Sequence, residues 1–234
     1  MAAVPPELDS GGALKPKPFT FAGFAMKKLF LLPLVAMFVA FCGSVSAQTV
    51  DANAPDQLIK TVTQQVLDEI KSDQKIQAGD INKITELVNQ KILPYTDFTR
   101  TTRLVMGRNW NSATPEQQKQ IVEQFKMLLI RTYSGALAQV RNQTVQYKPF
   151  RASPDDTDVV VRSVVMNNGS PVELDYRLYK TAQGWRVYDI NVLGAWLIQA
   201  YQQQFNEQIS QNGVAGLLQF LTQRNQQLAS GKAS

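Results

Sequence analysis

The sequence predicts an α+β fold in which helices are segregated from a curved antiparallel sheet. Three observations lead to this prediction. Apolar residues recur at helical spacing as far as Arg141, a strand-like period follows over residues 144–192, and a helical period returns from residue 194. Within residues 172–178, apolar and charged side chains alternate, so we expect one face of the sheet to be covered and the other to meet water.

The first helical part, residues 56–141, is expected to contain four helices. Pro55 opens the first, and Asp80 can cap the second through its carboxylate. A third, shorter helix covers about residues 96–105 and stops near Gly107. The apolar residues that repeat along the first two helices are Leu58, Val62, Val66, Leu67, Ile70, Ile81, Ile84, Leu87, Val88 and Ile92.

The fourth helix has the clearest start signal in the chain. Thr114 can cap it through its hydroxyl, Pro115 suits the first helical position, and Gln117 can reach back to complete a capping box. Apolar residues then recur every three or four positions, so one broad face of this helix must be buried. That face contains Ile121, Phe125, Leu128, Leu129, Thr132, Tyr133, Ala136, Leu137 and Val140.

Four segments rich in β-branched and aromatic residues are expected to form strands. They are residues 144–150, 159–166, 172–180 and 185–192. Asn and Gly in two of the connections, residues 167–169 and 183–184, favour hairpin turns, so the strands should form a meander. Two closing helices are expected within residues 194–222, followed by a flexible Gln-rich tail over residues 223–234.

Residues 26–47 have the pattern of a cleavable secretory signal, with two lysines, an apolar run and small residues before a cleavage site between Ala47 and Gln48. The apolar run, residues 29–41, is shorter than the roughly 20 residues that span a bilayer, which disfavours a permanent membrane helix. Phe41 before Cys42 disfavours a lipoprotein. Residues 1–25 are rich in Pro and Gly and are expected to be an over-called translation start or a disordered extension.

Composition excludes most hydrolase mechanisms. The chain has no histidine, and its one cysteine precedes the predicted cleavage site. A Ser-His-Asp or Cys-His nucleophile is therefore excluded, as are the usual zinc and copper sites, and we expect neither a metal nor a cofactor. A mechanism based on carboxylates alone stays open. Its candidates, Asp156, Asp158, Asp175 and Asp189, show no pairing pattern. Without residues 1–47 the net charge falls from +5 to +3, which is too mild to indicate nucleic acid as a partner.

Several motifs stand in the order and spacing of the MlaC family, the toluene-tolerance, periplasmic phospholipid-binding proteins. They are Pro94-Tyr95-Thr96-Asp97-Phe98, Gly107 with Trp110, Ala113-Thr114-Pro115-Glu116-Gln117, Arg131-Thr132-Tyr133, Ala136-Leu137, Val161-Arg162-Ser163, Asp175-Tyr176-Arg177-Leu178 and Gly184-Trp185-Arg186-Val187-Tyr188-Asp189. The chain resembles this family over nearly all of residues 48–222. Gln118 and the segment Ala195-Trp196-Leu197 depart from the family pattern, and the second departure bears on the width of a pocket.

The resemblance implies a periplasmic carrier, not an enzyme, that ferries phospholipid between the outer membrane and an inner-membrane ABC transporter and so maintains outer-membrane lipid asymmetry. Its implied partners are an outer-membrane lipoprotein–porin complex and the substrate-binding subunit of the transporter, and we expect a monomer. It also implies a sheet like the cone of nuclear transport factor 2, packed with about six or seven helices around a deep apolar pocket. Two other interpretations stay open: a carboxylate-based isomerase or hydrolase on the same cone, and a periplasmic interaction module with a filled core.

Twelve residues from the helices and the sheet are expected to line the pocket. They are Leu104, Phe125, Leu129, Tyr133, Val161, Leu174, Tyr176, Leu178, Val187, Leu197, Tyr201 and Phe205. The alternative is that these residues form a solid core. Arg100, Arg103 and Arg108 are expected to contact the lipid phosphate or an acidic partner surface, the alternative being a solvated charged face.

Overall fold

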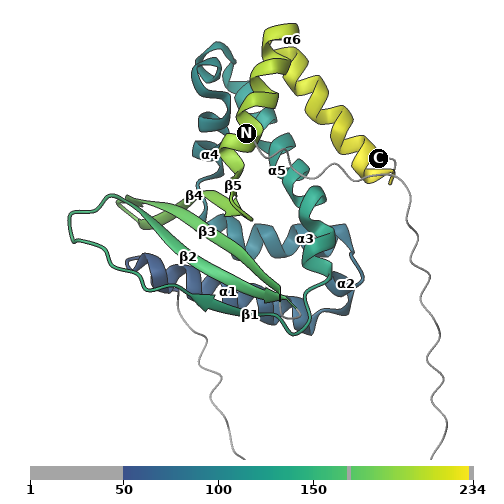
Figure 1. The fold of residues 1–234 in the computed structure, drawn as a ribbon. Coiled ribbons are helices and arrows are strands. Elements are labelled where there is room, and N and C mark those ends of the chain that lie inside the picture. The colour runs from purple at the N-terminus through teal and green to yellow at the C-terminus, as the bar shows by residue number, and fades with distance from the viewer. Residues whose placement is uncertain (1–49, 168–169, 232–234) are drawn as a thin grey trace, which may run out of the picture. The chain divides into compact units, whose positions relative to one another are not determined.

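The order of elements runs from helices to a sheet and back to helix, and this confirms the α+β prediction (Figure 1). The computed structural model describes residues 50–167 and 170–231. The predicted signal peptide and the residues before it lie outside this range. All described residues belong to one unit of the chain, and only this unit is considered below.

Short polar caps separate the first helices. Helix α1 spans Pro55–Ser72 and is followed by α2, Gln74–Gln77, and α3, Ile81–Leu87. Asp80 caps α3 as expected, because its carboxylate accepts from the N–H groups of Asn82 and Lys83. Helix α2 was not expected; Asp73 caps it in the same way. The second expected helix also ends differently, as a π-helical turn over Val88–Ile92 and a 3-10 turn over Leu93–Tyr95.

Helix α5 starts at the predicted cap, and α4 stops near Gly107 as expected but starts at residue 98 instead of 96. Helix α4, Phe98–Met106, is capped by Asp97 and ends at Gly107, whose φ of +57° suits glycine. Helix α5, Pro115–Ala138, has the complete capping box. The Gln117 N–H donates to the Thr114 hydroxyl at 3.2 Å, and the Thr114 N–H donates to the Gln117 side chain at 3.0 Å.

The sheet is an antiparallel meander in which each strand pairs with the next one in sequence. A bulge between Arg177 and Leu178 shifts the register of β3 and β4. The fifth strand has only two residues and was not among the four expected. The strands are β1 Thr144–Tyr147, β2 Asp158–Asn167, β3 Ser170–Thr181, β4 Gly184–Val192 and β5 Ala195–Trp196.

Helix α6, Leu197–Ala229, confirms the two expected closing helices, because its backbone leaves helical geometry at Gly213 (φ +67°, ψ −172°) and two helical segments meet there. The expected flexible tail from residue 223 is helical as far as Ala229. Asn225 is 3% exposed and donates from its amide to the backbone and side-chain oxygens of Gln124, both at 2.8 Å. Leu217, Leu221 and Asn225 recur every four residues and attach this end of α6 to α5.

The buried apolar side chains form three separate clusters. The first belongs to α4, α5 and α6 and is centred on Phe125 and Phe205. The second joins α1 to the sheet through Leu58, Val161 and Leu178. The third belongs to α1, α2, α3 and α5 and contains Ile70, Ile76, Ile84, Leu87 and Ile130.

Candidate functional site

Three connections link the three apolar clusters to one another. Helix α5 contributes Phe125 to the first cluster and Ile130 to the third. Helix α1 contributes Leu58 to the second and Ile70 to the third. The start of α4 is fixed to β4, because the Asp97 N–H donates to the Val187 carbonyl at 2.8 Å. Each cluster is therefore joined to the other two by a rigid element or by backbone hydrogen bonding.

The predicted lining residues fall into three groups. Phe125, Phe205, Val161, Leu178 and Val187 are buried within the first or second cluster, and Leu129, Tyr176 and Tyr201 pack against these clusters half-buried. Tyr133, Leu174 and Leu197 are also half-buried but pack against none of the three. Leu104 differs from both groups, because it is 37% exposed on α4.

Three of the half-buried residues, Tyr133, Tyr176 and Tyr201, are tyrosines in an apolar setting. Burial raises the pKa of Tyr201 to about 12, although a hydrogen bond with Thr132 opposes the shift. Burial likewise raises the pKa of Tyr176 to about 12, and it raises the pKa of Tyr133. These phenols stay neutral at physiological pH, so they offer hydrogen bonds without placing a charge in the apolar region.

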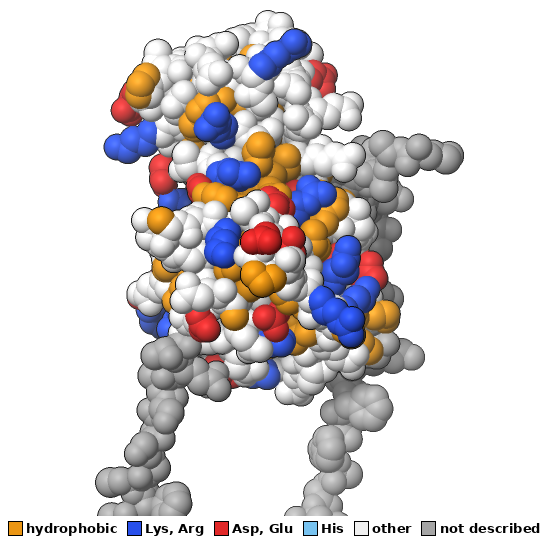
Figure 2. Space-filling model, turned by 90° about the vertical axis from the view of Figure 1, so that its left-hand side faces the viewer, with side chains coloured by type: hydrophobic (Ala, Val, Ile, Leu, Met, Phe, Trp, Pro, Cys, Tyr) orange, Lys and Arg blue, Asp and Glu red, His pale blue; other side chains and the backbone are white. Residues whose placement is uncertain are grey.

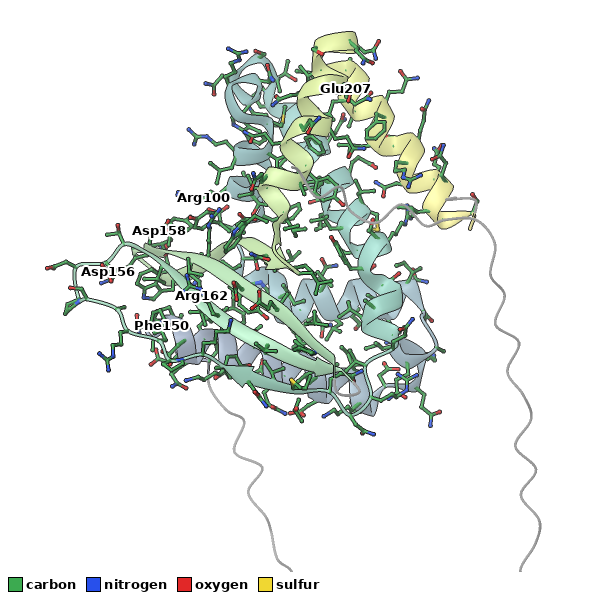
Figure 3. All side chains as sticks on the ribbon, in the orientation of Figure 1. Arg100, Phe150, Asp156, Asp158, Arg162 and Glu207 are labelled. Atoms are coloured by element: carbon green, nitrogen blue, oxygen red, sulfur yellow. The ribbon has the colours of Figure 1, made fainter. Side chains whose placement is uncertain are left out.

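Arg100 lies in an aromatic cluster at the start of α4. Its guanidinium is 4.0 Å from the ring centre of Tyr179 and 4.9 Å from that of Tyr188. The Tyr188 hydroxyl donates to both oxygens of Asp158, at 3.0 and 2.9 Å, and Figure 3 shows Arg100 and Asp158 at the same end of the sheet. The Tyr179 hydroxyl donates to Asp97. Arg103 and Arg108, in contrast, are exposed.

Asp189 joins three elements from a buried position on β4. It is 2% exposed, and its Oδ2 is 3.0 Å from the Arg177 guanidinium on β3. Its Oδ1 accepts from the N–H of Ile190 at 3.0 Å and from the N–H of Ile198 in the first turn of α6 at 3.1 Å. Burial raises the Asp189 pKa, while these donors act against the shift. Both oxygens are thus occupied by structural contacts.

Arg177 also stacks on Trp196, a contact that the sequence did not predict. Its guanidinium lies 3.8 Å from the Trp196 ring centre. The alternation of β3 placed Arg177 on the face expected to meet water, but its contact with Trp196 depends on β5, which is too short to leave a pattern in the sequence. Tyr179 and Tyr188 were missed for a related reason, because the β-bulge breaks the simple alternation.

A separate pocket of about 390 Å³ opens between the start of α4, α5 and the β3–β4 hairpin. Its walls are mostly polar and include Thr96, Thr181 and Arg186. Glu123 and Lys126 form an ion pair of 2.5 Å in its wall. None of the twelve predicted lining residues belongs to this pocket. Figure 2 shows one face of the molecule, on which basic side chains are interspersed with apolar and acidic ones.

The described residues offer little for metal chemistry or membrane spanning. Within residues 50–167 and 170–231, His, Cys, Asp and Glu form no group of three or more that could hold a metal ion. In the same part of the chain, every helix is too short or too polar to cross a bilayer.

Comparisons with known proteins agree with one another. Residues 60–223 match the profile of the MlaC protein family. The chain is 26% identical over 166 residues to the toluene tolerance protein ttg2D of Pseudomonas putida, covering 70% of this chain and 77% of that protein. It is 24% identical over 178 residues to the intermembrane phospholipid transport system binding protein MlaC of Haemophilus influenzae, covering 74% and 82% of the two chains.

A solved structure is similar at the level of both sequence and fold. It is that of the phospholipid-binding protein from Ralstonia solanacearum in complex with a phospholipid. The identity is 60%, the TM-score is 0.72, and the match covers 73% of this chain and 96% of that one.

Proposed function

Because the chain belongs to the MlaC family, we propose that it is a periplasmic phospholipid carrier that holds acyl chains in an apolar pocket. The observation that carries this proposal is the 60% identity, over 96% of its length, to a protein solved with a phospholipid bound. The carrier would move lipid between the outer membrane and an inner-membrane ABC transporter and so maintain lipid asymmetry. Its partners would be an outer-membrane lipoprotein–porin complex and the transporter's substrate-binding subunit.

The proposed pocket lies among the three clusters. A solid core would bury all twelve predicted residues, but Tyr133, Leu174 and Leu197 are half-buried and pack against none of the clusters. These three are the best candidates for direct contact with acyl chains. The fully buried Phe125, Val161, Leu178 and Phe205 would support the wall, and Val187, Leu129, Tyr176 and Tyr201 would complete it. Leu104 is exposed on α4 and would belong at most to the rim.

Energetics suit such a pocket. Burying one CH₂ away from water contributes about 0.8 kcal/mol. Two acyl chains of about 15 methylenes each must therefore recover roughly 20 kcal/mol by burial in the carrier. The same chains already lie in hydrocarbon in a bilayer, so transfer between bilayer and carrier is nearly balanced. The direction of transport would then come from the partners.

The predicted arginines take different roles in this proposal. Arg103 and Arg108 are exposed and free to meet a lipid phosphate or an acidic partner surface. Arg100 is held over Tyr179 and Tyr188, so it would act mainly by fixing α4 on the sheet.

Native mass spectrometry of the protein purified from the periplasm without detergent tests the carrier function. We expect a stoichiometric adduct of phospholipid mass. Leu174→Gln should lower the loaded fraction, because it puts an amide among acyl chains. Glu173→Gln, the same product residue one position earlier on the exposed face of β3, is the matched control and should stay loaded. A wild-type protein without lipid, which also takes none up from phospholipid vesicles, would refute the proposal.

The carboxylate-based enzyme is a second candidate because burial raises the Asp189 pKa. The occupied oxygens of Asp189 argue for a structural role instead. An enzyme of this kind would turn over a substrate and lose turnover, but not bound lipid, on Asp189→Asn.

A further inference from the structure

Leu193 has two unusual properties at once. It lies in the turn between β4 and β5, where its side chain is 68% exposed. Its φ of +52° makes it the one non-glycine residue with positive φ in the described part of the chain. The left-handed region is unfavourable for a leucine and favourable for Gly or Asn. A leucine here therefore costs stability and gains nothing from packing within the protein.

The turn holds this conformation through hydrogen bonds on both sides. The Leu193 N–H donates to the Glu173 carbonyl on β3 at 3.1 Å. The Gly194 N–H donates to the Asn191 side chain at 2.8 Å. The backbone is thus fixed while the side chain points away from the protein. Strain that the surrounding structure maintains is commonly found at functional positions.

We propose that the β4–β5 turn is a contact point with the surface of a phospholipid bilayer, into which Leu193 inserts. The neighbouring residues suit the level of the head groups. Trp196 follows three residues later, and Arg177, with a side chain that is 38% exposed, stacks on its ring at 3.8 Å. Trp and Arg both combine an apolar body with a polar end and favour the boundary between hydrocarbon and water.

Charges near the turn are compatible with an anionic surface. Glu173, which accepts the Leu193 N–H through its backbone, has its carboxylate 3.1 Å from the Lys148 ammonium. Asp189 is paired with Arg177. Both carboxylates are therefore compensated, and repulsion of anionic lipid is reduced.

This inference rests on the proposed carrier function and adds a place of contact with the membrane. The two residues of β5 connect the turn to α6, whose first residue, Leu197, belongs to the proposed acyl-chain pocket. Lipid would then enter or leave close to the point of contact. One inserted leucine gives weak and reversible attachment, which suits a carrier that must depart again.

Sedimentation with vesicles of phosphatidylethanolamine and phosphatidylglycerol tests the contact, with protein purified from the periplasm. Leu193→Asn should bind these vesicles roughly tenfold more weakly and take up lipid more slowly at first. Because Asn tolerates positive φ, its thermal midpoint should not fall. Leu193→Phe should restore or exceed wild-type binding. Gly79→Asn, in an exposed turn with φ of +82° between α2 and α3, is the matched control and should bind like wild type.

Two results would overturn the proposal. One is equal vesicle binding by wild type and Leu193→Asn. The other is unchanged vesicle binding with loss of copurified lipid, because Leu193 would then contact the cargo and not the bilayer. Failure of the carrier function itself would be recognised separately, as a wild-type protein that neither contains nor takes up phospholipid.

Discussion

At the scale of single residues, Asp189 connects three elements of the fold. One carboxylate on β4 joins β3 through Arg177 and the first turn of α6 through the Ile198 N–H. The sequence placed this aspartate within an expected strand, residues 185–192. It could not name the partners, because the Ile198 N–H is a backbone group and its position depends on the β4–β5 turn.

Asp189→Ala is expected to lower the free energy of unfolding by about 3 kcal/mol. The substitution leaves Arg177 without its partner and the Ile190 and Ile198 N–H groups without an acceptor. Urea denaturation followed by circular dichroism measures the loss. Asp189→Asn keeps one acceptor oxygen and should lose less, and equal stability of the Ala variant and wild type would contradict this role.

Tyr176 and Tyr201 are expected to make the folded protein less stable at alkaline pH. Their pKa in the folded state is about 12, against 10.0 for an ordinary tyrosine. The folded state thus retains the phenolic protons longer than the unfolded state. This contribution is present in full below pH 10 and is lost as the pH rises from 10 to 12, by roughly 1 kcal/mol per pH unit for each tyrosine.

Urea denaturation at pH 9, 10 and 11 tests this expectation. Tyr201→Phe, which removes one phenol, should show the shallower decline above pH 10. Identical slopes for the variant and wild type would exclude Tyr201 as a source of the pH dependence.

At the scale of elements, polar caps and turn residues made the starts of helices predictable. Thr114 and Asp80 act through local contacts, and such contacts can be read from sequence. The length of α6 was not predictable in this way. Gln-rich residues 223–229 have no apolar period of their own, and they stay helical because Asn225 bonds to α5.

The β3–β4 hairpin also depends on a distant segment. The Trp185 N–H donates to the Ala52 carbonyl at 2.7 Å, which brings the chain before α1 against Gly184. A Cβ at Gly184 would lie 2.6 Å from the Ala52 oxygen, and the φ of +98° is unfavourable for any other residue.

Gly184→Ala is therefore expected to lower the free energy of unfolding by roughly 3 kcal/mol, from backbone strain and the clash together. Thermal unfolding measured by calorimetry tests this. Gly194→Ala, with a similar φ of +88° but no atom within 4 Å of its Cβ, isolates the strain and should cost less.

At the scale of the whole molecule, the three apolar clusters share elements without merging into one core. The sequence predicted most of the apolar residues involved, but it did not predict how they are distributed among the three clusters. Helical and strand periods show which face of an element is buried, and they carry no information about which elements share a cluster. For the same reason, the exposure of Leu104 on α4 was not foreseen.

If lipid fills the space among these clusters, it should stabilise the fold. At a free lipid level of 100 times the dissociation constant, the gain is about 2.7 kcal/mol, which corresponds to a rise of roughly 5–10 °C in the thermal midpoint. Calorimetry of loaded and delipidated protein measures this difference. Equal midpoints would mean that the clusters hold together without cargo and that lipid is bound elsewhere.

The sequential order of the strands has a consequence for folding kinetics. Each strand of the meander pairs with its neighbour in sequence, so the sheet closes only short loops and can form early. Of the described elements α1 comes first in the chain, yet its Leu58 and Ile59 share a cluster with residues of β2, β3 and β4, which follow about a hundred residues later. Until those strands have emerged from the export machinery, the apolar face of α1 is uncovered, and this is the interval in which the unfolded chain most needs protection from aggregation.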